Sequence, residues 1–146
     1  MRKLVLAGLV QWALICVEHA HAKQTDRWNW SHNIEFSTSN VERPRTPEEL
    51  AALIRATDGK IKVTGTSHSF NDIADTPGTH VILDRMKDIS FDLKNKRVTF
   101  GAGFTYTDLI KELRAKKMAL HNLPSLPHLN VVGSVVTGTH GSGTHK

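Results

Sequence analysis

The chain carries two kinds of hydrophobic pattern, and each predicts a different type of element. Leu50, Leu53 and Ile54 recur at the i, i+3, i+4 spacing of one helix face. Thr46 stands where it can cap the helix N-terminus, and Gly59 stands where a helix commonly ends. We therefore expect a helix between Thr46 and Gly59 that packs back on the strand following it.

Alternation of apolar and polar residues then takes over. Short strands are predicted over residues 61–64, 80–83, 89–93 and 97–101. The last two flank Lys94-Asn95, and this arrangement predicts a β-hairpin. The helical period returns from Thr105 to Lys116. Strands, helices and a hairpin mixed in this way indicate an α+β or α/β sandwich.

Small residues follow the strand predicted at residues 61–64 and present one imidazole. Gly65, Thr66 and Ser67 carry little side-chain bulk, so a flat ligand can lie against the backbone there. Gly65 also permits backbone angles that other residues avoid. His68 stands next to this surface, with Ser69 as a possible hydrogen-bonding group. The alternative is an ordinary turn at the end of a strand with a solvated histidine, since short motifs give many false positives.

A second stretch of small residues lies far along the chain. Glycines 133, 138, 141 and 143 are interleaved with hydroxyl residues, and we expect them to expose backbone N–H groups. Concave runs of N–H groups bind anionic oxygens, and the diphosphate of a dinucleotide fits that description. A flexible glycine turn is the alternative.

Together the two stretches resemble one family. GTSHSFND (65–72), LPSLPHLNVVGSVVTGTHGSG (123–143) and the leading NW-x-x-NI (29–34) resemble the FAD-binding domain of the alditol and aldonolactone oxidases. These enzymes belong to the vanillyl-alcohol-oxidase, or p-cresol methylhydroxylase (PCMH), superfamily. The resemblance implies an α+β, PCMH-type fold of two subdomains, not a Rossmann fold. It covers about residues 28–143.

The resemblance also implies a cofactor and the residues that hold it. The cofactor is FAD, joined covalently through its 8α position to His68. The residues that match the flavin-wrapping segment are Val63, Thr64, Gly65, Thr66, Ser67 and Ser69. Those that match the cofactor loop are Asn130, Gly133, Thr137, Gly138, Thr139 and His140. Ser125 matches a serine that contacts both flavin and substrate. Asn130 departs from the serine of relatives, which puts that one contact in question.

The implied reaction is hydride transfer from the CH–OH group of a polyol or sugar lactone to the flavin. Dioxygen then accepts the electrons and yields hydrogen peroxide. Pro124 stands at a position resembling a gatekeeper for dioxygen and favours an oxidase over a dehydrogenase. In the similar oxidases the groups that activate the substrate lie in a C-terminal cap domain. We therefore expect residues 23–146 to be the N-terminal part of the FAD-binding domain and to be inactive alone.

The first 22 residues have the features of a secretory signal peptide. Met1-Arg2-Lys3 is positive, residues 4–17 are almost entirely apolar, and Ala20-His21-Ala22 suits cleavage after Ala22. An uncleaved membrane anchor is the alternative. The single cysteine, Cys16, lies in this segment, so the predicted mature part forms no disulfide. We expect a secreted or secretory-pathway protein.

Composition weighs against other partners. The formal net charge of +5 is small and scattered, which does not favour nucleic acid. A metal-binding module is a further alternative because the chain contains His121, His128, His140 and His145. Their spacing matches no standard ligand pattern, and we expect no metal. A non-catalytic flavin-binding remnant is the other alternative. The sequence does not indicate the oligomeric state.

Overall fold

The computed structural model describes residues 27–143. The predicted signal peptide, residues 1–22, and the candidate ligand His145 lie outside these residues. Within the described range, no helix has the length and apolar character needed to cross a membrane.

A small parallel sheet forms one half of the molecule. It consists of β1 (Val41–Glu42), β2 (Ile61–Thr64) and β3 (Thr79–Ile82), in the order β1-β3-β2. β3 is the central strand, and all four of its residues are buried. Ile61 pairs with Thr79 and Thr64 with Ile82, so β2 and β3 end at the same edge of the sheet. A short 3-10 helix, η1 (Asp72–Ala74), lies in the connection between them.

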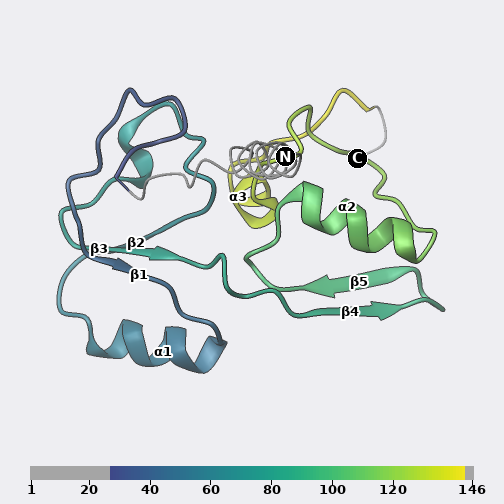
Figure 1. Ribbon diagram of the computed structural model, residues 1–146, viewed down its shortest axis with the longest axis horizontal. Helices are drawn as coiled ribbons and strands as arrows, with labels where there is room; N and C mark the ends of the chain where they lie inside the picture. The colour runs from purple at the N-terminus through teal and green to yellow at the C-terminus, as the bar shows by residue number, and fades with distance from the viewer. Residues whose placement is uncertain (1–26, 144–146) are drawn as a thin grey trace, which may run out of the picture.

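The predicted hairpin forms the other half. β4 (Ile89–Asp92) and β5 (Arg97–Phe100) pair antiparallel, as expected. α2 (Tyr106–Ala115) lies over the hairpin (Figure 1). Thr105 and Asp108 form a reciprocal capping box at its start, which satisfies two N–H groups of the first turn. The helix predicted from Thr105 to Lys116 is therefore confirmed.

The main core lies between α2 and the hairpin. Leu109 is fully buried, and Leu113 is 2% exposed. Phe104, Tyr106 and Val131 complete the cluster of buried apolar residues. Partly buried side chains from both hairpin strands pack against this cluster. The apolar face predicted for the second helix thus provides the core that holds this half together.

The first helix forms where the sequence predicted it, but its packing differs. α1 (Pro47–Ala56) is capped by Thr46, whose side chain accepts a hydrogen bond from the backbone N–H of Glu49. None of its residues is buried, and Ile54 is 53% exposed. Leu50 and Leu53 are half-buried, so the rest of residues 27–143 covers the predicted apolar face of this helix only in part.

A third helix was not predicted. α3 (Val131–Val136) occupies the apolar run before the second glycine-rich stretch. Its β-branched valines and Gly133 have low helix propensity, so the pattern suggested no helix. α3 lies between the parallel sheet and the hairpin half (Figure 1). This position brings the two stretches of small residues close together.

The core predicts a large effect of one truncation. Leu109→Ala should lower the free energy of unfolding by about 2–5 kcal/mol, because it opens a cavity in a fully buried site. Val135→Ala, at a side chain that is 72% exposed, should change it by less than about 0.5 kcal/mol. Denaturant unfolding of the complete gene product measures both. Equal effects of the two variants would contradict this placement of the core.

Candidate functional site

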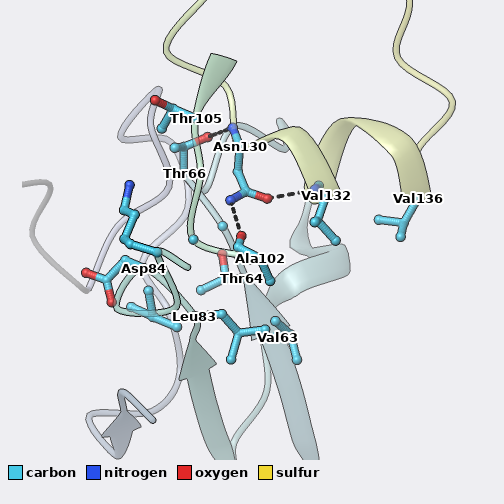
Figure 2. A pocket seen from close by; sticks show the side chains of 15 residues that line it. Val63, Thr64, Thr66, Leu83, Asp84, Ala102, Thr105, Asn130, Val132 and Val136 are labelled. Atoms are coloured by element: carbon cyan, nitrogen blue, oxygen red, sulfur yellow. Dashed lines mark hydrogen bonds between the residues drawn. The ribbon is translucent and has the colours of Figure 1, made fainter. Parts of the chain in front are cut away.

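A cavity of about 430 Å³ opens where β2 and β3 end. Its walls come from both halves of the molecule and from α3 (Figure 2). The lining residues are Val63, Thr64, Gly65, Thr66, Ile82, Leu83, Asp84, Lys87, Ala102, Gly103, Thr105, Asn130, Val132, Gly133 and Val136. The carboxyl edge of a parallel sheet is the usual place for ligands in open α/β sheets. The position therefore marks a candidate ligand site.

β2 is exposed on the side of this cavity. Alternation predicted Val63 as an inward-facing residue, yet Val63 is 56% exposed, while Thr64 is 5% exposed. The predicted inward and outward faces of β2 are therefore reversed at these two residues. Val63 lines the cavity instead of the core, together with Val132 and Val136 of α3 (Figure 2). An exposed apolar wall of this kind suits a ligand with an apolar ring system.

The backbone of Gly65 lies directly against Asn130. A Cβ atom added at Gly65 would lie 2.8 Å from the Cβ of Asn130, closer than side-chain atoms normally approach. Only glycine therefore fits at this position without a shift of the loop or of α3. This contact joins the first predicted stretch to the second.

Asn130 uses its polar atoms to hold three segments in place. Its backbone N–H donates to Thr66 Oγ1 at 3.3 Å (Figure 2). Its Nδ2 donates to the carbonyls of Ala102 at 2.8 Å and Phe104 at 3.2 Å. Its Oδ1 accepts from Gly133 N at 2.7 Å and so caps α3. An asparagine reaches all these partners at once, whereas a serine in its place would lack the Nδ2 donor.

The sequence predicted free backbone N–H groups in the second stretch of small residues. The structure has such groups in the loop after β2. The backbone N–H groups of Ser67, His68 and Ser69 have no acceptor among residues 27–143. Ser67 has φ of 53°, in the left-handed region that non-glycine residues seldom adopt. Such backbone conformations are concentrated at functional sites. Free N–H groups in sequence are the arrangement that binds anionic oxygens.

In the second stretch, the expectation of free N–H groups is wrong for residues 137–139. The N–H groups of Thr137, Gly138 and Thr139 donate to the carbonyls of Gly133, Val135 and Ser134. They close the C-terminal end of α3, with Gly138 at φ of 66°. These N–H groups are occupied because α3, which was not predicted, ends here. The last carbonyls of a helix need donors from outside the helix.

His68 lies at the end of the first loop but does not line the cavity. Its ring stacks on Trp30, with centroids 4.3 Å apart and planes inclined by 21°. Its Nε2 atom is buried and has no hydrogen-bond partner among the described residues. The imidazole is therefore held by ring contacts and not by hydrogen bonds.

The N-terminal segment fixes the backbone on both sides of His68. Trp30 N donates to the carbonyl of Ser67 at 2.8 Å. The buried side chain of Asn29 donates to the carbonyl of Ser69 at 2.9 Å. The N-terminal segment therefore holds the loop that carries His68.

The remaining predicted residues do not line the cavity. Ser125 is exposed, and its loop is joined to α2 by a hydrogen bond from Thr107 N to the carbonyl of Pro127 at 2.8 Å. Thr137 through His140 are also exposed. The assignments of Ser67 to Ser69, Ser125 and Thr137 to His140 as cofactor contacts therefore stay predictions.

Sequence reasoning missed the wall that the hairpin half contributes. Leu83, Asp84, Lys87, Ala102 and Thr105 come from segments without a recognisable ligand motif. The available signal was the small-residue corner at Gly101-Ala102-Gly103. At Gly103 a Cβ atom would lie 2.6 Å from the carbonyl oxygen of Leu83, so this corner packs directly against the segment after β3.

The two charged residues of the cavity wall each have a partner. Asp84 forms an ion pair with Arg43, and Lys87 forms one with Asp108 at 2.5 Å. Burial tends to raise the pKa of Asp108, but hydrogen bonds from Lys87 and Thr105 outweigh it and hold that pKa below its ordinary value. The ion pair with Asp108 holds the Lys87 side chain beside the cavity. Between residues 27 and 143, no three His, Cys, Asp or Glu side chains gather closely enough to hold a metal ion.

Comparison with known proteins identifies relatives by sequence. A family described as "FAD binding domain" matches residues 38–146. Alditol oxidase from Streptomyces sp. is 40% identical over 119 residues, which are 79% of this chain and 28% of the relative. L-gulonolactone oxidase from Mus musculus is 34% identical over 119 residues, which are 79% of this chain and 27% of that enzyme. The chain thus spans little more than a quarter of these curated relatives.

A solved structure shares the fold. Cholesterol oxidase from Brevibacterium sterolicum aligns with a TM-score of 0.68 and 22% identity, over 79% of this chain and 24% of that one. The predicted α+β, PCMH-type FAD-binding fold is therefore confirmed, as is the resemblance to the alditol and aldonolactone oxidases.

Three features of the described residues fit a flavin dinucleotide. The apolar wall of Val63, Val132 and Val136 suits a flat ring system. The glycine at position 65 lets a ligand approach the backbone. The free N–H groups of residues 67–69 suit a diphosphate. The buried, unpartnered Nε2 of His68 adds an imidazole without a competing hydrogen bond at that atom.

The contact between Gly65 and Asn130 leads to a prediction about stability. Gly65→Ala should lower the free energy of unfolding by about 1–3 kcal/mol, because the added methyl group overpacks the contact. The penalty should persist in an Asn130→Ala background, because the close contact is with the Cβ atom that alanine keeps.

Gly133→Ala is the matched control. A Cβ atom added at Gly133 lies 3.4 Å from its nearest neighbour, Asn130 Oδ1. The substitution also replaces a glycine within a helix. The substitution should leave stability unchanged or raise it by up to about 1 kcal/mol. Denaturant unfolding of the complete gene product without added FAD measures all three variants. A Gly65→Ala protein as stable as wild type would refute the contact.

Proposed function

This chain belongs to the FAD binding domain family, and from that premise we propose that it holds the FAD of an oxidase acting on CH–OH groups. The proposed substrates are polyols or sugar lactones, with dioxygen as electron acceptor and hydrogen peroxide as product. Support for the substrate class comes from the activities named for two relatives, alditol oxidase and L-gulonolactone oxidase. The observation that carries the cofactor assignment is the cavity floored by Gly65 beside the free N–H groups of residues 67–69.

The described residues divide the work of binding. We assign the cavity residues Val63, Thr64, Gly65, Thr66, Asn130 and Gly133 to one part of the cofactor. The N–H groups of Ser67, His68 and Ser69 donate to its diphosphate oxygens. Lys87, held beside the cavity by Asp108, adds positive charge for the same anionic group. Ser125 and residues 137–140 are proposed as outer contacts.

The bound flavin would supply the two-electron acceptor that no side chain provides. The chain's own residues orient that group and exclude water from one of its faces. His68 would be the residue that holds the flavin covalently, through one of its imidazole nitrogens and the 8α position. A neutral imidazole is a suitable nucleophile near neutral pH.

We further propose that the protein enters the secretory pathway through the predicted signal peptide at residues 1–22. N-terminal sequencing of the expressed product tests this proposal, because cleavage after Ala22 leaves Lys23 as the first residue.

The cofactor assignment predicts a coloured protein. The complete gene product should be yellow, and most of its flavin should stay with the protein after acid precipitation. His68→Ala should still bind FAD but release all of it into acid, whereas His121→Ala, at an exposed histidine, should behave as wild type. Absorbance of the pellet and supernatant measures this. A folded wild-type protein that is colourless and insensitive to added FAD would refute the function.

The activity assignment predicts peroxide formation. The complete gene product should release hydrogen peroxide with xylitol, sorbitol, gulonolactone or galactonolactone, measured by a peroxidase-coupled assay. Residues 1–146 alone should give no turnover, because the similar oxidases place their substrate-activating groups in a cap domain. Reduction of an artificial dye without peroxide would identify a dehydrogenase and contradict the oxidase assignment. Robust turnover by residues 1–146 would contradict the need for a cap.

A further inference from the structure

Three planar side chains from distant parts of the chain meet at the end of the first loop. Trp30 comes from the N-terminal segment, His68 from the loop after β2, and His128 from the loop before α3. The ring centroids of Trp30 and His68 lie 4.3 Å apart, and those of Trp30 and His128 lie 5.8 Å apart. We call these three residues the ring cluster. The cavity wall does not include them.

The ring cluster restricts how the imidazole of His68 can turn. Trp30 lies nearly parallel to it, at 21°, and His128 lies 5.2 Å away at 36°. The ring of Phe70 meets it edge-on, 5.4 Å away at 89°. Rotation of the imidazole about its bond to Cβ would break these contacts. The ring plane is therefore set by neighbours that form no hydrogen bond with it.

The backbone around His68 is held by the same segment that supplies Trp30. The carbonyl of Ser67 accepts from Trp30 N at 2.8 Å, and the carbonyl of Ser69 accepts from Asn29 Nδ2 at 2.9 Å. These two carbonyls flank His68 directly. The N-terminal segment thus fixes both the position of the loop and the plane of the ring.

Both imidazoles of the ring cluster carry a cost. The Nε2 atoms of His68 and His128 are buried and have no hydrogen-bond partner among residues 27–143. An unpartnered buried polar atom lowers stability, and such atoms call for a functional explanation. Two aliphatic side chains would pack here without that cost. The pairing of two histidines against one indole therefore points to a role beyond packing.

We propose that Trp30 and His128 are positioning residues for the covalent attachment of the flavin to His68. Their ring contacts fix the plane of the imidazole, so that the same face and nitrogen would be presented to the flavin in every molecule. This inference rests on the proposed function. Correct orientation of two reacting groups governs the rate of bond formation between them, and a misplacement of about 1 Å costs up to about 100-fold.

The test separates attachment from binding. Apoprotein of the complete gene product is mixed with excess FAD, and protein-bound flavin is followed over time in acid-denatured samples. Trp30→Leu and His128→Asn should slow attachment by about 10- to 100-fold. Trp30→Phe keeps a ring against His68 and should restore most of the rate. The FAD dissociation constant is measured for the same substitutions in a His68→Ala background, where no bond forms, and should change less than about twofold.

Matched controls exist within the chain. Trp28 belongs to the same segment but stacks on His32, with centroids 6.2 Å apart, so Trp28→Leu should attach flavin at the wild-type rate. His121→Asn replaces an exposed histidine outside the ring cluster and should also match wild type. Thermal unfolding of each variant reports on folding. If Trp30→Leu fails to fold, His128→Asn still decides the question.

Each outcome has one meaning. Slow attachment with unchanged FAD affinity supports the proposal. Attachment at the wild-type rate in both variants overturns it, and so does a parallel loss of affinity and stability, which would indicate a purely structural role. If wild-type flavin is fully released by acid, the positioning proposal fails while FAD binding stands. If the wild type does not bind FAD at all, the proposed function itself fails.

Discussion

The structure depends most on the contact between Gly65, which has no side chain, and Asn130, the residue that caps α3. Gly65 approaches Asn130 so closely that a methyl group does not fit between them. Asn130 in turn bonds to Thr66, to the carbonyls of Ala102 and Phe104, and to the start of α3. One residue therefore sets the distance between the parallel sheet, the hairpin half and the helix. The cavity is the space that this spacing leaves open.

The same arrangement explains why apolar groups remain exposed beside it. Val63 faces the cavity instead of the core, and Val132 and Val136 face it from α3 (Figure 2). Exposed apolar surface is unfavourable in water, so a bound ring system that covers it would add stability. The loop after β2 complements this wall with polar N–H groups. A ligand with a flat apolar end and an anionic end satisfies both sets of residues, as FAD does.

Local signals in the sequence predicted local structure well. The bounds of β2, the hairpin and α2 followed from periodicity, and the start of α1 followed from the cap at Thr46. Periodicity contains no information on which strands pair, so the parallel order β1-β3-β2 was not predicted. α3 was missed because valine and glycine disfavour helices in isolation, and tertiary contacts through Asn130 override that preference. The small-residue stretches identified part of the cavity, but the wall around Leu83 and Lys87 carries no motif.

Hydrogen–deuterium exchange of the complete gene product, with and without FAD, tests the central claim most directly. If the cofactor occupies the cavity joined by Gly65 and Asn130, peptides covering residues 63–69 and 130–136 should both exchange more slowly when FAD is bound. The exposed helix α1, residues 47–56, should exchange at the same rate in both states. FAD binding that leaves exchange in both cavity segments unchanged would contradict the account.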